Sequence, residues 1–283
     1  MTDAPRLPNV NGMISPELLF WYELALKMAL TALVVVITSV AVERSGPFIG
    51  ALIAALPTAA GAAYAILAIE HPPSFIAASA IGSAATGAAV SIFALVYTVL
   101  AQRRGLVLSL GVALLVWFVA VALLRLVAWT PLSAAALNAV VFAITIPLSW
   151  RYRASGPPKK FLRTAFDIPV RALAAAIVVA VVTTASYSIG SFASGVFALF
   201  PIIFCSSIVI LHPRVGGKAT ASMTAHAQVA FIGLALAFLF VHCLAEPLGS
   251  WLALAIGLSV AVGWSGLLLL VRLGAMRRMR NQI

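Results

Sequence analysis

Apolar residues run along almost the whole chain in stretches of about twenty, and short polar connectors separate them. A membrane-spanning helix needs roughly 20 mostly apolar residues to cross the hydrocarbon core of a bilayer. Dividing the chain at prolines, glycines and charged residues predicts nine spans, at 20–42, 48–69, 75–100, 105–128, 131–150, 169–188, 192–212, 221–244 and 250–272. The pattern therefore predicts an all-α polytopic membrane protein with about nine transmembrane helices.

Lysine and arginine lie mainly on one side of these spans. Fifteen fall in the connectors and the tail of one face, whereas Arg6, Lys27 and Arg125 fall on the other. An excess of Lys and Arg marks the cytoplasmic side of a membrane protein. We therefore expect a multi-pass protein of the inner (cytoplasmic) membrane, with its N-terminus outside and its C-terminus in the cytoplasm. Because topology explains the net charge of +11, we expect the lipid bilayer as a partner and no nucleic acid.

The sequence aligns with itself, without a gap, at an offset of 144 residues. Gly46 then aligns with Gly190, and Pro57 with Pro201. The two copies comprise spans one to four and six to nine, and the fifth span between them inverts the second copy. We therefore predict two inverted four-helix repeats joined by an extra helix, an architecture common among secondary transporters. Inverted repeats also occur in channels and in membrane proteins of other function.

This division predicts five segments. An extracytoplasmic N-terminal segment is followed by membrane repeat 1, a linker helix with a basic cytoplasmic loop, the inverted membrane repeat 2 and a basic cytoplasmic tail. Their respective bounds are 1–19, 20–128, 129–166, 167–272 and 273–283.

The second span of each repeat carries a proline, Pro57 or Pro201, after a face of small residues. The small residues recur every four positions, which lets helix backbones approach closely. They are Gly46, Gly50 and Ala54 in one copy and Gly190, Ser194 and Ala198 in the other. Proline removes a backbone donor and frees a carbonyl, which in lipid must find a partner or face a cavity.

Polar side chains follow both prolines: Thr58 and Tyr64 in the first copy, Ser206 and Ser207 in the second. Two interpretations stay open for this arrangement. One is a helix broken near the midplane, whose exposed backbone helps to hold a solute. The other is a proline kink that neighbouring helices satisfy.

The segment ALIAALPT (51–58), followed by Tyr64 and Glu70 and preceded by Lys27, resembles the small inner-membrane proteins of the GlpM family. Those proteins are single four-helix units about the size of one repeat, so the resemblance covers roughly residues 20–125. It implies a tandem-duplicated relative of that family, and it implies a fold rather than an activity. The second copy departs from the motif, with Ile202, Ile208 and Arg214 in the places of Thr, Tyr and Glu.

An acid and a base four residues apart lie near the start of the first span of each repeat. The pairs are Glu23 with Lys27 and Asp167 with Arg171, and each can form an ion pair within its helix. They could be equivalent elements of two gates or attract an anionic solute; alternatively, they are interfacial pairs that snorkel to the headgroups. The depth of Lys27 in its span favours a functional role, whereas the boundary position of Asp167 and Arg171 favours the interfacial one.

Other titratable residues give little sign of chemistry. His226, with Gln228 nearby, could carry a coupling proton, but a neutral histidine bonded across helices is the favoured interpretation. The seven acids do not cluster and the histidines lack ligand spacing, so we expect no metal and no other cofactor. Without convergent titratable groups, we do not expect an enzyme.

The favoured function is a secondary transporter or exporter that moves a small solute, anionic or amphipathic compounds included, by alternating access between the repeats. The alternative is a non-transporting accessory or assembly protein of envelope or polysaccharide biogenesis; a channel lacks a filter-like motif. A second copy of the chain, forming a homo-oligomer, is a further candidate partner. The candidate binding or gating residues are Glu23, Lys27, Pro57, Thr58, Tyr64, Asp167, Arg171, Pro201, Ser206, Ser207 and His226.

Overall fold

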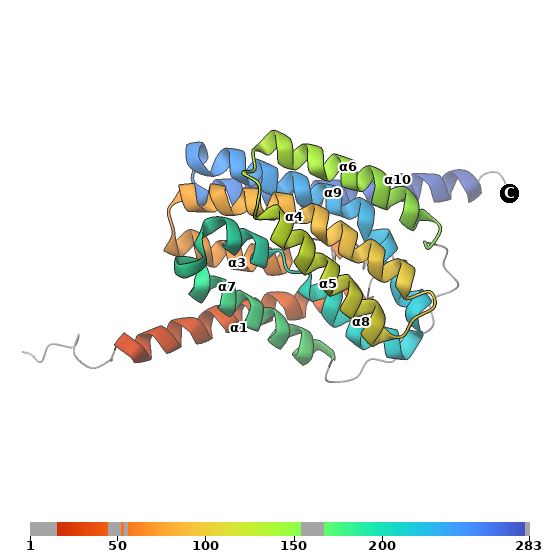
Figure 1. Cartoon of the computed structure of the whole chain (residues 1–283), viewed down its shortest axis with the longest axis horizontal. Coiled ribbons are helices and arrows are strands. Elements are labelled where there is room, and N and C mark those ends of the chain that lie inside the picture. The colour runs from red at the N-terminus through yellow and green to blue at the C-terminus, as the bar shows by residue number, and fades with distance from the viewer. Residues whose placement is uncertain (1–15, 45–51, 54–55, 154–166, 281–283) are drawn as a thin grey trace, which may run out of the picture.

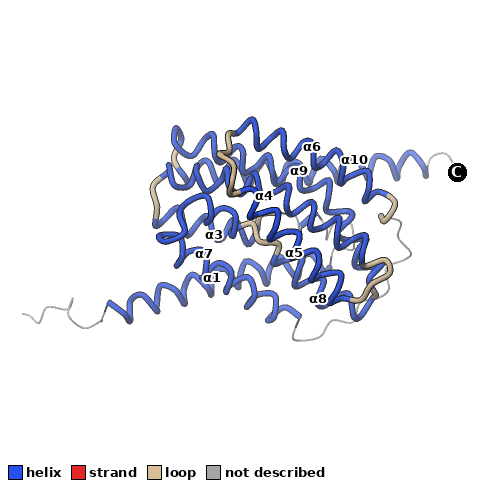
Figure 2. Tube along the Cα trace, in the orientation of Figure 1, coloured by secondary structure: helices blue, strands red, loops and turns tan. Residues whose placement is uncertain are grey.

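The computed structural model of the chain describes residues 16–44, 52–53, 56–153 and 167–280 (Figure 1). Across these ranges the chain forms helices and short connectors without a β-strand (Figure 2). The helices are α1 (Pro16–Arg44), α3 (Thr58–Glu70), α4 (Pro73–Leu100), α5 (Leu106–Leu124), α6 (Pro131–Trp150), α7 (Asp167–Ala198), α8 (Ile202–Val215), α9 (Gly217–Leu248) and α10 (Ser250–Arg280). Seven are long and apolar enough to cross a membrane, and α3 and α8 are shorter apolar helices. The predicted all-α polytopic membrane fold is confirmed.

The long helices lie side by side, with α4 and α9 packed against each other at the centre (Figure 1). In the α4 span 72% of the residues are buried, against 17% in the spans of α1 and α10. The outer helices expose large apolar side chains such as Leu115 and Leu270. A helix that is apolar on every side suits a membrane interior, so these surfaces can face lipid.

The fifth predicted span is α6, which packs against both α4 and α9. Asn138 Nδ2 donates to the carbonyl oxygen of Ala84 at 2.8 Å. Ser91 Oγ lies 2.7 Å from Thr145 Oγ1 and donates to Gln228 Oε1 at 2.6 Å, while Gln228 Nε2 donates to the Ser91 carbonyl at 2.9 Å. These buried bonds join α4, α6 and α9 into one scaffold, because a membrane interior offers few competing partners.

In both predicted proline spans, the described residues are helical before and after the proline. In the second copy, Gly190 (φ 79°, ψ 169°) interrupts α7, so residues 191–198 form a separate helical stretch before the connector to α8. Gly190 therefore begins this stretch instead of lying on its face. In the first copy, the chain is helical at 52–53 and again from Thr58. Gly46, Gly50 and Ala54 lie outside the described residues.

A close backbone contact does occur, but through other glycines than those predicted. A Cβ atom on Gly195 would lie 1.8 Å from the Ser79 carbonyl oxygen, and one on Gly82 would lie 2.5 Å from the Phe192 carbonyl oxygen. Ser83 Oγ also donates to the Gly195 carbonyl at 2.7 Å. The stretch 191–198 is thus held directly against the backbone of α4.

Candidate functional site

Pro57 and Pro201, 144 residues apart, have the same backbone conformation. Pro57 has φ −74° and ψ 50°, and Pro201 has φ −75° and ψ 49°. The N–H of the following residue donates to the carbonyl of the preceding one, at 2.7 Å in both copies. These dihedrals and the three-residue hydrogen bond are typical of an inverse γ-turn. The chain is therefore broken, rather than kinked, at both prolines.

From these breaks, α3 and α8 run toward opposite ends of the molecule (Figure 1). The end of α3 leads directly into the start of α4, whereas His212 near the end of α8 lies 2.8 Å from the Tyr97 hydroxyl near the end of α4. At 1.5 Å per residue, α4 is about 42 Å long. The two breaks thus lie near the middle of the bundle, well away from both ends.

A single cavity of about 50 Å³ lies between the two breaks. It is lined by residues 56–60 and 198–204 together with Val90 on α4 and Phe231 and Leu234 on α9. None of these residues is charged. Because a buried water needs roughly 10–15 Å³, the cavity has room for about three to five water molecules. Both breaks therefore line the same small cavity.

The polar groups at this cavity belong mainly to the backbone. Neither α3 nor α8 has a side-chain N-cap. Within the described residues, the N–H groups of Ile203 and Phe204 have no backbone acceptor, and the buried hydroxyl of Thr58 has no partner. A helix N-terminus carries a partial positive charge and favours anions. The cavity is thus apolar in its side chains and polar in its backbone, since both the N–H end of α8 and the C=O end of the stretch 191–198 lie at it.

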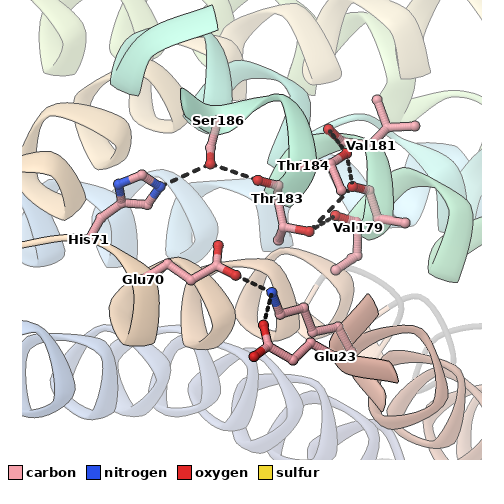
Figure 3. A network of polar contacts seen from close by, with 10 residues as sticks. Glu23, Glu70, His71, Val179, Val181, Thr183, Thr184 and Ser186 are labelled. Atoms are coloured by element: carbon pink, nitrogen blue, oxygen red, sulfur yellow. Dashed lines mark hydrogen bonds and ion pairs between the residues drawn. The ribbon is translucent and has the colours of Figure 1, made fainter. Parts of the chain in front are cut away.

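A second group of polar residues lies where α3 ends (Figure 3). Lys27 on α1 forms an ion pair with Glu70, and its Nζ lies 4.0 Å from Glu23 Oε2. The side chains of Lys27 and Glu70 are 23% and 14% exposed, whereas that of Glu23 is 64% exposed. The principal partner of Lys27 is therefore Glu70, from another helix, and the predicted pairing within α1 is the weaker contact.

His71 continues this group toward α7 (Figure 3). Its Nε2 lies 2.9 Å from Ser186 Oγ, and its ring stacks on Phe75 at 3.8 Å. Since Ser186 donates its proton to the Thr183 carbonyl, the His71 Nε2–H is the donor to Ser186. Burial lowers the pKa of His71, and the charge of Glu70 opposes that shift. The end of α3 is thus tied to both α1 and α7.

The remaining candidates are placed elsewhere. Tyr64 is buried and its hydroxyl lies 2.8 Å from Ser83 Oγ. Ser206 and Ser207 are buried on α8 and do not line the cavity. Arg171 is buried on α7, His226 lies on α9, and the side chain of Asp167 is outside the described part. The structure thus brings together Pro57, Thr58 and Pro201 at the cavity and Glu23 with Lys27 at the end of α3.

Three residues of the polar group at the end of α3 were not predicted from the sequence: Glu70 as the partner of Lys27, His71 and Ser186. Glu70 and His71 carried a signal, because two consecutive polar residues end an apolar helix. Ser186 carried none, since serine is common in membrane helices. Compared with protein families, curated proteins and solved structures, the chain matches none of them.

Proposed function

We propose that this protein is a secondary transporter or exporter that moves a small solute across the inner membrane by alternating access between two inverted repeats. The observation that carries the proposal is the pair of identical proline breaks, 144 residues apart, that line one central cavity. Discontinuous helices that meet near the midplane are typical binding sites of such transporters. The charge partition supports an outer N-terminus and a cytoplasmic C-terminus.

The course of the chain on either side of the breaks supports an inverted relation. Helices α3 and α8 follow equivalent prolines yet run to opposite ends of α4. Direct repeats would carry them in the same direction. An inverted pair gives each outward-open conformation an inward-open counterpart of similar energy, which is the physical basis of alternating access.

The cavity of about 50 Å³ represents a closed state in this mechanism, because it holds only a few waters. Opening toward the outer side requires the end of α3 to part from α1 and α7, where Lys27 and Ser186 hold it. Opening toward the cytoplasm requires the end of α8 to part from α4, where Tyr97 holds His212. The two contacts act as opposite gates.

The backbone of the cavity selects the class of solute. The N-termini of α3 and α8 both face it without side-chain caps, and the described residues that line it include no carboxylate. Such an environment stabilises a negative charge or a strong hydrogen-bond acceptor. We therefore favour a small solute with an anionic group. A tandem-duplicated relation to the GlpM family is part of the proposal and agrees with four helices in each repeat.

The test compares the metabolites of cells that lack the protein with those of cells that produce it. Pro57→Ala and Pro201→Ala restore a backbone donor at each break, and they should abolish any solute shift that the wild-type protein causes. Pro147→Ala is the matched control, since Pro147 lies inside α6 and does not line the cavity. Protein levels in the membrane are measured for every variant.

A solute whose distribution follows the wild-type protein and Pro147→Ala, but not the two break variants, supports transport. The same solute is then assayed in liposomes that contain the purified protein. If no solute shifts and the protein instead copurifies stably with another membrane protein, the accessory or assembly function is favoured. Equal effects of Pro147→Ala and Pro57→Ala would argue against a role for the breaks.

A further inference from the structure

A second cavity, of about 480 Å³, lies beside the first break and between α1, α3, α9 and α10. Its floor is formed by the buried side chains of Tyr64, Phe238 and Val241. Its rim includes Trp251 and Leu258, which are 58% and 51% exposed. Because these helices present apolar side chains to the bilayer, the cavity is a groove that opens toward lipid. We call it the lateral groove.

The lateral groove meets the central cavity at the break. Pro57 and Thr58 line both spaces. The groove also contains the Tyr64 side chain, but its hydroxyl lies 2.8 Å from Ser83 and so has a partner. The buried hydroxyl of Thr58 has none among the described residues. The groove thus has apolar walls and one unsatisfied polar end, at the N-terminus of α3.

We propose that the lateral groove binds a single-chain amphiphile with an anionic head, such as a long-chain carboxylate. The chain lies along α3 and α10, and the head accepts a hydrogen bond from the Thr58 hydroxyl at the N-terminus of α3. This assignment rests on the proposed function, because it makes the amphiphile the transported solute and the groove its entry from the bilayer.

The dimensions of the groove favour one chain over two. The groove has about 480 Å³, roughly ten times the volume of the central cavity. A space of this size suits one alkyl chain with its head at Thr58. The charge of the head follows from the N-terminus of α3, whose dipole favours an anion.

The purified full-length protein is incubated with a photoreactive 12-carbon carboxylate, and the labelled peptides are identified by mass spectrometry. A photoreactive trimethylammonium compound of the same chain length and a photoreactive two-chain phosphatidylglycerol serve as competing probes. Labelling by the carboxylate is expected on α3 and α10, at residues that line the groove. Labelling should be several-fold weaker with the cationic probe.

Two substitutions and a control localise the site. A Cβ atom added at Gly61, which lines the groove, would meet no atom within 4 Å, so the side chain of Gly61→Leu starts in open space and occupies the groove. It should reduce labelling at least tenfold. Thr58→Val keeps the shape of the side chain and should reduce labelling about three- to tenfold, the effect of one hydrogen bond. Gly111→Leu, equally unobstructed but on α5, should leave labelling unchanged.

Equal labelling of Gly61→Leu and Gly111→Leu would overturn the proposal, as would preferential labelling by the cationic or the two-chain probe. If Gly61→Leu does not fold, Thr58→Val alone decides the outcome. Transport of the same carboxylate into liposomes separates this inference from the proposed function. Groove labelling with no transport of the carboxylate supports the binding site but contradicts the amphiphile as the transported solute. Transport of another solute that Gly61→Leu leaves intact supports the transporter and contradicts the amphiphile.

Discussion

Gly195 offers a sharp test of the packing that positions the second break. It lies on the stretch 191–198, six residues before Pro201, and faces the backbone of α4. A Cβ atom at this position would lie 1.8 Å from the Ser79 carbonyl oxygen and 2.6 Å from the carbonyl carbon. Since both are backbone atoms, no rotamer change relieves the contact in Gly195→Ala.

The size of the effect follows from this geometry. Cβ contacts shorter than 3.0 Å essentially never occur, so the stretch must move from α4 by about 3.0 − 1.8 = 1.2 Å. Overpacking of this kind costs about 1–3 kcal/mol. The displacement also weakens the bond from Ser83 to the Gly195 carbonyl, worth roughly 0.6 kcal/mol in a membrane protein. Alanine has a higher helix propensity than glycine, which regains up to about 1 kcal/mol. The net decrease in the free energy of unfolding is therefore roughly 1–3 kcal/mol.

The free energy of unfolding is measured by denaturant titration of the purified protein in mixed micelles. Gly111→Ala is the matched control, because its added Cβ meets nothing within 4 Å. The control should be as stable as the wild-type protein or more stable by up to about 1 kcal/mol. If Gly195→Ala is no less stable than Gly111→Ala, the close packing against α4 is wrong.

Three further predictions use the same unfolding measurement. Lys27→Met and Glu70→Gln should each lower the free energy of unfolding by about 1–3 kcal/mol, because each leaves a partly buried charge without its partner. The double variant should lose less than the sum of the two, and strict additivity would contradict the ion pair. A histidine whose pKa is lowered in the folded state makes the free energy of unfolding decrease as the pH falls below about 6.5. His71→Gln should therefore reduce this decrease between about pH 7.5 and 5.5. An unchanged slope would exclude a contribution of His71 to the pH dependence. Gln228→Leu should cost roughly 1–2 kcal/mol through its two bonds to Ser91, and a neutral effect would refute the scaffold.

Local chemistry allowed much of the fold to be predicted from the sequence. The predicted span 131–150 matches α6, because Thr130 caps the helix in a capping box and Pro131 occupies its first turn. The positions of the two prolines were also visible, since Pro57 and Pro201 interrupt apolar segments at equivalent places, although the sequence left open whether they break or kink the helix. A structural feature whose cause lies within a few residues of it can be predicted from a single sequence.

Contacts between distant segments could not be predicted in this way. Glu23 is four residues from Lys27 and was the obvious partner, whereas Glu70, 43 residues away, forms the closer and more buried pair. Gly195 was likewise hidden, because its role depends on the approach of α4. Gly190 was read as part of a small-residue face, although its positive φ ends one helical stretch and begins the next. Each of these features is set by tertiary packing.

The most direct test of alternating access is the reactivity of a cysteine placed at the first break. Thr58→Cys is made in a background in which Cys205 and Cys243 are replaced by alanine, with Ala84→Cys, fully buried on α4, as the control. A membrane-impermeant thiol reagent is added to either face of sealed vesicles. If access alternates, Thr58→Cys reacts from both faces while Ala84→Cys reacts from neither. Reaction of Thr58→Cys from one face alone, or from neither, would contradict alternating access.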